Sequence, residues 1–388
     1  MKEDDDLGPS EVSLKALELQ KKKRKRKNKK KKPFNPTSKS SEDNLEDEVA
    51  KSVREVNQLL GEASEINVED QNDPNFKPQK RGLLSIEPKN LNPENEMKRL
   101  FGSKVVMADH QRHKRGNHRH RHMRTSHWLV VPKPSWPQPG KTGLSMKFLE
   151  SDKYGNQFFT FEHSPSYQNV QKRFFHAVDS LNPEFIIQLL NDHPFHIDAM
   201  LQLSDICKMG EDSTRAAELI ERTLYAMEAA FHPLFNLAVG TSRLDYKRQE
   251  NRAFFIALFR HISNVGARAC HRTALEFCKL TLGLDPDNDP LGILLMLDFY
   301  AIRAQQHSWF IDFVESWDPQ RNLTQLPNMA YSIALAKFYG SKTNDLSDAD
   351  EKIQKALIEF PLLTLCTSHQ EQNSCCLLVA SIFTSLYY

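Results

Sequence analysis

The chain has 388 residues, with 52 Lys and Arg against 50 Asp and Glu, and 39% of its residues are hydrophobic. This length allows roughly two to three domains. The small net charge hides an uneven chain, because Lys and Arg concentrate in the first third and apolar residues after Gly143. The longest apolar runs, Leu291–Leu297 and Cys375–Ala380, are far shorter than the roughly 20 residues that cross a bilayer, so we expect no membrane contact.

The sequence predicts a protein of the cytosol and nucleus. It begins Met1-Lys2-Glu3-Asp4, without the apolar core of a secretory signal peptide. In a reducing compartment, cysteines without CxxC spacing are expected to be buried thiols and not disulfides or zinc ligands. The cysteines are Cys207, Cys270, Cys278, Cys366, Cys375 and Cys376.

Residues 1–43 are predicted to be a disordered, Lys/Arg-rich arm. Like charges at this density repel each other and leave nothing apolar to bury. A polyanion is the natural ligand, either nucleic acid or an import receptor, and binding to phosphates through counterion release does not depend on base identity. The predicted nucleic-acid contacts are Lys21, Lys22, Lys23, Arg24, Lys25, Arg26, Lys27, Lys29, Lys30, Lys31 and Lys32.

Residues 44–62 are predicted to form one short amphipathic helix. Apolar residues recur every three or four positions from Leu45 to Leu60, and acidic residues favour the first turn. The apolar stripe could pack on a partner or on the helical half of the chain. A continuous DNA-binding and dimerisation helix that includes the basic arm is disfavoured, because Pro33 and Pro36 would interrupt it.

Residues 63–143 are predicted to be a linker that carries three local features. The first is a short peripheral helix, in which Asn92 caps the start, Pro93 takes the first helical position and Gly102 ends it. The second is a His/Arg-rich block that is expected to contact RNA, since neighbouring Arg charges would repel a metal ion. Its basic residues are Arg112, Lys114, Arg115, Arg119, Arg121 and Arg124.

The third feature of the linker is an extended segment with Trp128 and Trp136 among four prolines. Its indoles either insert into an intramolecular groove or stack on RNA bases. Gly140-Lys141-Thr142 resembles the end of a phosphate-binding loop, but Ser135 stands where the first glycine is required. Nucleotide hydrolysis is therefore not expected.

Residues 144–361 are predicted to be an α-helical repeat domain, which gives an all-α fold of the tetratricopeptide-like α-solenoid type. Apolar residues fall at helical spacing, and strand-like alternation is nearly absent. Three imperfect copies of a repeat of about 34 residues are visible, at 194–224, 274–286 and 335–361. Stacked repeats offer a surface for a partner, so this domain is expected to bind and not to catalyse.

Candidate chemistry is sparse in the helical half. His193, His196 and Asp198 lie close in sequence, but Asp192 or His193 before Pro194 is better explained as a helix start than as part of a metal site. The pairs Arg243 with Asp245 and Glu250 with Arg252 are predicted to be structural ion pairs or a polar recognition loop. No catalytic set stands out, so we expect no metal, no cofactor and no enzyme activity.

Ordered motifs along the chain resemble one family. They are Asn92-Pro93-x-x-Glu96-x-Lys98-Arg99-x-Phe101-Gly102, Trp128 with Pro132-Lys133-x-x-Trp136-Pro137, Phe231-His232-Pro233-Leu234-Phe235, Arg243-Leu244-Asp245-Tyr246 and Glu250-Asn251-Arg252. The sequence resembles the transcription factor 25 family, also called nuclear localized protein, from about residue 44 to 361. Thr367–Tyr388 match nothing in that pattern, so we expect residues 362–388 to be a divergent end and the chain to be truncated or alternatively ended.

The resemblance implies a non-enzymatic adaptor subunit of the ribosome quality control complex. Such a subunit binds large ribosomal subunits and rRNA, works with the ubiquitin ligase listerin and the ubiquitin machinery on stalled nascent chains, and helps to recruit a segregase. A nuclear DNA-associated transcriptional repressor is the alternative. The residues of the family motifs that we expect to contact partners are Trp128, Trp136, Arg243, Asp245, Tyr246, Glu250 and Arg252.

Overall fold

The computed structural model describes residues 82–103, 128–137, 142–341 and 346–361. The predicted basic arm, the predicted helix at 44–62, the His/Arg-rich block and residues 362–388 lie outside these ranges. The structure therefore bears on the helical half of the chain and on two segments that precede it. None of the described helices has the length and apolar character needed to cross a bilayer.

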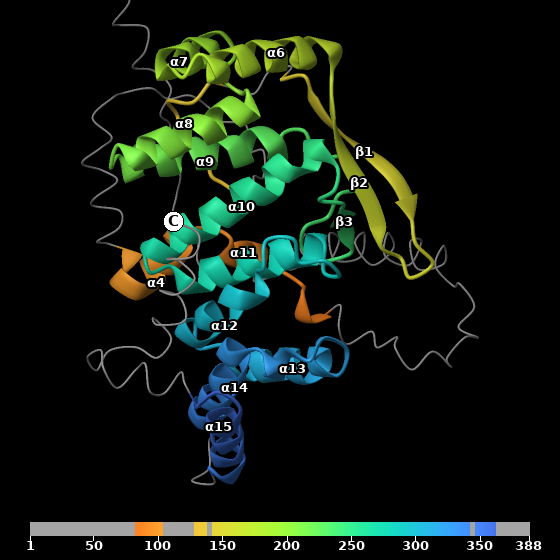
Figure 1. Cartoon of the computed structure of the whole chain (residues 1–388), viewed down its shortest axis with the longest axis vertical. Coiled ribbons are helices and arrows are strands. Elements are labelled where there is room, and N and C mark those ends of the chain that lie inside the picture. Colours follow the sequence, from red (N-terminus) through yellow and green to blue (C-terminus); the bar gives the residue numbers. More distant parts are fainter. Residues whose placement is uncertain (1–81, 104–127, 138–141, 342–345, 362–388) are drawn as a thin grey trace, which may run out of the picture. The chain divides into compact units, whose positions relative to one another are not determined.

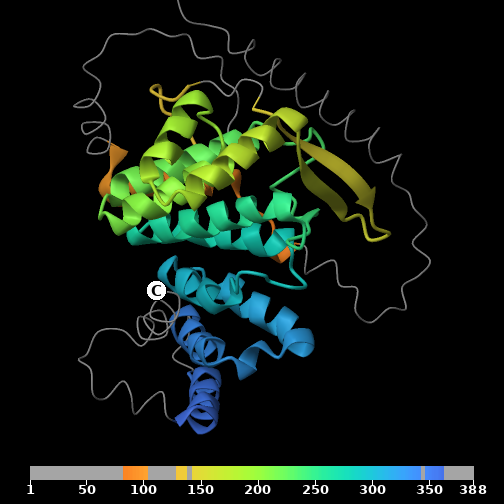
Figure 2. The same ribbon diagram turned by 45° about the horizontal axis from the view of Figure 1, so that its top comes forward.

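The described part of the chain is mostly helical, as predicted. From α6 onward each helix packs on the next one along the chain (Figures 1 and 2). The α-helices are α4 (Pro93–Phe101), α6 (Pro165–Asp179), α7 (Pro183–Asp192), α8 (Ile197–Met209), α9 (Ser213–Glu228), α10 (Gln249–Ala267), α11 (His271–Leu284), α12 (Leu294–Arg303), α13 (His307–Arg321), α14 (Pro327–Gly340) and α15 (Ser347–Glu359). Two short 3₁₀ helices are η1 (Pro88–Asn90) and η2 (Leu323–Gln325).

Four helix pairs are joined by turns of the same design. Three residues separate α6 from α7, α8 from α9, α10 from α11 and α12 from α13, and the middle residue of each turn is left-handed. The middle residues are Leu181 (φ 56°), Glu211 (φ 62°), Ala269 (φ 59°) and Gln305 (φ 56°). Residues other than glycine seldom adopt this conformation. Its recurrence shows that one kind of short antiparallel helix hairpin is used four times.

Helix starts follow local capping rules. The side chains of Asn92, Ser164, Asn182 and Asp212 each accept a hydrogen bond from a backbone N–H in the first turn of their helix. The predicted helix start at Asp192 or His193 is wrong, because α7 ends there and α8 begins only after His196. Three residues of this turn, His193 to Phe195, reverse the chain between the two helices.

The all-α prediction is wrong for two segments. Strands β1 (Leu144–Ser151) and β2 (Gln157–His163) form an antiparallel hairpin, and β3 (Ser242–Leu244) pairs parallel to β2. The domain predicted to begin at residue 144 with helices therefore begins with strands. The signal was present, because apolar residues alternate along both strands of the hairpin and point to its buried face. They are Leu144, Met146 and Phe148 on β1 and Phe159 and Phe161 on β2.

Residues 82–101 were predicted to be linker and peripheral helix, but they pack against α11. Leu91 is fully buried, and both carboxylate oxygens of Glu96 accept hydrogen bonds from the first turn of α11, at Arg272 N (2.9 Å) and Thr273 N (2.8 Å). The predicted ends of α4 are confirmed by the Asn92 cap and by Gly102. We name residues 82–101 the strap.

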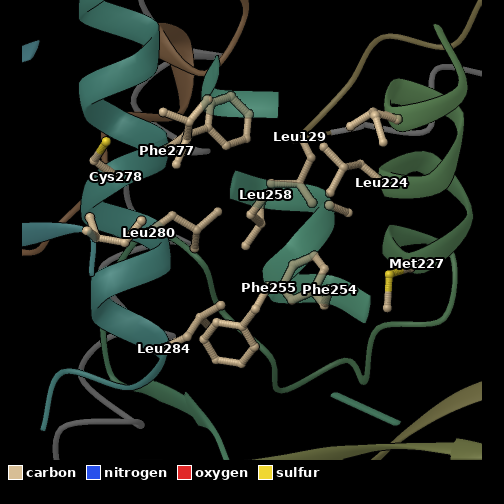
Figure 3. Close-up of a cluster of buried hydrophobic side chains, with 14 of the residues drawn as sticks. Leu129, Leu224, Met227, Phe254, Phe255, Leu258, Phe277, Cys278, Leu280 and Leu284 are labelled. Carbon is tan, nitrogen blue, oxygen red and sulfur yellow. The ribbon is translucent and has the colours of Figure 1, made fainter. Parts of the chain in front are cut away.

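The core is continuous from the strap to the helices. Figure 3 shows α10 between α11 and α9, with Phe254, Phe255 and Leu258 of α10 in the middle of the cluster. Leu129, from the segment before the hairpin, reaches the same core. Of the cysteines in the described ranges, Cys270 and Cys278 are buried and Cys207 is half-buried, in line with the predicted thiols.

The stability of this core depends on pH through His261. Its ring packs on Phe277 with 4.6 Å between centroids, and neither ring nitrogen has a hydrogen-bond partner among the described residues. Burial lowers the pKa of His261 from 6.5 to about 3. Below pH 6.5 the unfolded chain takes up a proton that the folded chain does not, so folding weakens as the pH falls.

We expect His261→Phe to remove this dependence. As the pH falls from 6 to 5, the free energy of unfolding of the variant should rise relative to that of the parent by about 1.4 kcal/mol. Urea denaturation at pH 7, 6 and 5 measures it, with a Phe substitution at the exposed His176 as the control. A difference between variant and parent that does not change with pH would contradict the assignment.

Candidate partner-binding surface

The structure places the predicted contact residues on two supports. The first support is α9, along which Trp128 and Trp136 lie. The second is the segment from Arg243 in β3 to Arg252 in the first turn of α10. The basic residues of the arm and of the His/Arg-rich block lie outside the described residues. The candidate surface within the described residues therefore consists of these two elements.

The Trp/Pro segment is held on α9 by carboxylates. Glu228 accepts hydrogen bonds from the backbone N–H groups of Trp128 and Leu129, and Trp136 Nε1 donates to Glu218 Oε1 at 2.9 Å. Lys133 Nζ lies 3.0 Å from the other oxygen of Glu218. Trp136 is thus buried against α9, where its ring packs on Tyr225, whereas Trp128 stays 40% exposed.

The pKa values of these carboxyls reflect the same contacts. Burial raises the pKa of Glu228 against the opposing effect of the backbone N–H groups that it accepts from. Burial also favours a higher pKa for Glu218, but the hydrogen bonds from Trp136 and Lys133 outweigh it and hold that pKa below its usual value. Glu218 therefore stays ionised and keeps Lys133 and the indole in place.

Arg243 is a structural residue at the start of the second support. One nitrogen of its guanidinium, Nη1, donates to the carbonyls of Gly240 (2.8 Å), Ser242 (3.3 Å) and Gly283 (2.6 Å). The last of these lies on α11, so Arg243 fixes β3 to that helix. Gly240 has φ 70°, and a Cβ there would lie 3.1 Å from the carbonyl oxygen of Leu84 in the strap.

Asn251 joins the second support to the sheet. It is fully buried; its Oδ1 accepts from Phe161 N at 2.9 Å and its Nδ2 donates to Asp245 O at 2.9 Å. The amide side chain therefore continues the ladder of β2 beyond the end of β3. Asn251 belongs to one of the family motifs but was not among the predicted contact residues. Its signal in the sequence is weak, an Asn near the start of a helix between two charged residues.

We name residues 245–252, which lead from β3 into the first turn of α10, the charged loop. Asp245 Oδ1 accepts from Lys247 N at 2.8 Å, and the guanidinium of Arg252 donates to the carbonyls of Tyr246 and Lys247, both at 3.2 Å. The same guanidinium lies 5.7 Å from the centroid of the Tyr246 ring, which in turn packs edge-on against Phe255 of α10. The backbone of the loop is thus fixed by its own side chains.

The charged loop presents several exposed groups. Lys247, Arg248 and Glu250 are exposed, and Arg248 caps α10 without a side-chain hydrogen bond. Rigid, exposed charges of both signs suit recognition of another charged surface, where they give specificity and faster association.

The residues considered for a metal each have another contact. His193 lies 3.3 Å from Arg173, His196 Nδ1 caps α8 at Ala199 N, and Asp198 accepts from Gln171 at 2.6 Å. Burial lowers the pKa of His196 to about 4, so the ring is neutral and can accept that bond at pH 7. Over the described ranges, no group of three His, Cys, Asp or Glu side chains is placed to hold a metal ion.

Comparison with known proteins gives the class of this chain. Residues 159–377 match the family described as "Transcriptional repressor TCF25", which is more than half of the 388 residues, so the chain belongs to the TCF25 family. The match continues beyond residue 361, which corrects the prediction that the family pattern ends there.

Three relatives carry related names. Human "Ribosome quality control complex subunit TCF25" is 45% identical over 291 residues, which cover 73% of this chain and 42% of the relative. The mouse protein of the same name is 42% identical over 334 residues, covering 84% of this chain and 48% of the relative. "Ribosome quality control complex subunit 1" of Schizosaccharomyces pombe is 38% identical over 258 residues, covering 66% and 38%. The chain thus spans less than half the length of these relatives.

The Asn251 contact can be tested by its removal. Asn251→Ala leaves the buried N–H of Phe161 without a partner and leaves the Asp245 carbonyl with only the N–H of Arg248, so we expect a decrease of about 1–3 kcal/mol in the free energy of unfolding. The neighbouring exposed change Glu250→Gln should cost less than about 0.5 kcal/mol. Urea denaturation of both variants measures the two effects, and equal effects would contradict the role given to Asn251.

Proposed function

We propose that this chain is a non-enzymatic scaffold subunit of a ribosome quality control complex. The single observation that carries the proposal is that relatives 38–45% identical to this chain over most of its length are named as ribosome quality control complex subunits. Because the chain spans less than half of those relatives, the proposal concerns the part that this chain contains. Its place of action would be the cytosol, with a second pool in the nucleus.

A scaffold role fits the way the helices are connected. Four hairpins with the same three-residue turn follow one another, and each helix packs on its successor. We infer that α6 to α15 form a tetratricopeptide-like α-solenoid, interrupted between α9 and α10 by the segment that carries β3. Stacked hairpins of this kind supply long surfaces for partners.

The uneven distribution of charge suggests different roles for the basic segments and the helical unit. The basic arm, Lys21–Lys32, and the block from Arg112 to Arg124 would bind rRNA on the large ribosomal subunit through phosphates. The helical unit would position protein partners, for which we propose the ubiquitin ligase listerin, the ubiquitin machinery and a segregase. The charged loop, with Asp245, Tyr246, Glu250 and Arg252, and the exposed Trp128 are the described residues that we assign to partner contact.

A nuclear repressor is the second candidate, favoured by the family description "Transcriptional repressor TCF25". The two roles differ in how nucleic acid is bound. A ribosome-bound arm needs only phosphate contacts, whereas a DNA-binding repressor must read base edges in a groove. Sequence preference in binding therefore separates them.

The test is cosedimentation of the purified chain with large ribosomal subunits over a series of salt concentrations. Replacing the basic residues of 21–32 by Gln should weaken association and flatten its salt dependence, by about 0.7 in the logarithmic slope for each phosphate that is no longer neutralised. As a matched control, Lys352→Gln with Lys355→Gln removes two charges from α15, and binding should persist.

Two outcomes would contradict the proposal, the first for the arm alone and the second for the scaffold role as a whole. Unchanged ribosome association after the arm is neutralised would remove the arm from the mechanism. Tight binding to one DNA sequence, with no association with ribosomal subunits, would favour the repressor.

A further inference from the structure

Among the described residues, strand β1 forms an open edge of the sheet. The strand order is β1-β2-β3, so β2 has neighbours on both sides and β1 on one side only. Figure 1 shows β1 as the outermost strand, with the hairpin extending away from the helices, and Figure 2 shows the same extension from another direction. Within the described residues, β2 is the only element with extensive contact to β1.

The ladder identifies which backbone groups point outward. Ser164 N donates to Gly143 O at 2.9 Å, which makes Gly143 and Ser164 a hydrogen-bonded pair at the start of the hairpin. Hydrogen-bonded and non-hydrogen-bonded pairs alternate in antiparallel strands. The pair Met146 with Phe161 is therefore non-hydrogen-bonded, as is Phe148 with Phe159.

An independent contact supports this assignment. Phe161 N donates away from β1, to Asn251 Oδ1. Its partner Met146 must then direct its own N–H and C=O away from β2, toward the open side. Met146 and Phe148, together with the carbonyl of Leu144, thus present a row of backbone donors and acceptors at the spacing of a β-strand. The N–H of Leu144 already donates to Thr142 Oγ1 at 3.4 Å.

The two edge strands of the sheet, β3 and β1, differ in length and in their contacts. At the other edge, β3 has three residues and is fixed to α11 through the Arg243 bond to Gly283 O. β1 has eight residues, contains no proline, and keeps an unbroken register from Leu144 to Phe148, because its single bulge falls between Phe148 and Glu150. The charge of Lys147 is matched by Glu162 across the hairpin at 3.4 Å. Proteins usually shorten, bend or charge such an edge.

We propose that the edge of β1 at Leu144–Phe148 binds an extended segment of a partner polypeptide, which adds a fourth strand to the sheet. This inference rests on the proposed function in one respect, since a scaffold subunit has protein partners. The backbone itself defines the chemistry, because an extended main chain alone matches this row of donors and acceptors.

Side chains beside the edge define the preferred sequence of that segment. On the core side lie buried Met146 and half-buried Phe148, which packs edge-on against Phe159 at 5.6 Å between ring centroids. On the other side lie exposed Ser145 and Lys147. The favoured segment therefore alternates apolar and polar residues.

The probe is a fluorescein-labelled heptapeptide, Thr-Val-Thr-Val-Glu-Val-Thr, titrated into the full chain and followed by anisotropy. We expect saturable binding, and slower amide hydrogen exchange at Met146 and Phe148 when the peptide is bound. A matched peptide with proline in place of the central Val lacks the required N–H and should not bind.

Two protein variants complete the test. Phe148→Lys places a charge on the inward side of the edge, a device that natural proteins use against strand pairing, and should weaken peptide binding by about tenfold or more. Phe148→Leu keeps an apolar side chain and should stay within about twofold of the parent. If Phe148→Lys does not fold, hydrogen exchange on the unmodified chain still decides.

The outcomes are distinct. Equal binding of the proline peptide, or no change in exchange at Met146 and Phe148, would overturn the proposal. A dimer in light scattering that disappears in Phe148→Lys would show that the edge pairs with a second copy, which also overturns it. Ribosome cosedimentation of Phe148→Lys keeps the two proposals apart, because loss of peptide binding alone would leave the scaffold role intact.

Discussion

Complete burial of α11 is the constraint on which the rest of the structure depends. Every residue from Thr273 to Leu284 is buried, although Glu276 and Lys279 are among them. A helix without a solvent face must be covered on all sides, and its charged groups need partners inside the core. Glu276 finds them in Arg272 (3.1 Å), Lys279 (3.2 Å) and the backbone N–H of Glu87 in the strap (3.1 Å).

The cover of α11 explains why segments distant in sequence join the helical unit. α10 and α12 cover two sides, as neighbours in a series of hairpins do. The strap and β3 cover the remainder, with Glu96 at the first turn of α11 and Arg243 at Gly283 near its end. Lys279 lies 4.4 Å from the centroid of the Trp309 ring, whose Nε1 donates to Leu83 O. The strap is thus part of the core and not a linker.

Sequence reasoning succeeded where the determinants are local. The Asn92 cap, Pro93, Gly102 and the apolar spacing of α8, α9, α11 and α14 all act within a few residues, and these helices are confirmed. The packing of α4 against α11 was not predictable from the sequence, because Glu96 contacts residues about 176 positions away. Three residues of β3 are too few to show a period. The hairpin, in contrast, was visible in the alternation from Leu144 to Phe148 and was missed because the helical pattern that follows is longer.

In the candidate site, too, the contacts that could not be predicted are those to backbone groups and to residues distant in sequence. Arg243 and Arg252 were expected to form ion pairs or a polar recognition loop, and both guanidiniums donate to backbone carbonyls, which carry no signal in the sequence. Asn251 is the residue that relates the two proposed surfaces, since one amide side chain holds Phe161 in β2 and Asp245 in the charged loop. Because folding already orders both surfaces through this buried contact, a partner that engages either one loses little conformational entropy of the scaffold on binding. A partner that engages both meets one rigid unit, in which the geometry of the sheet edge and that of the loop cannot vary independently.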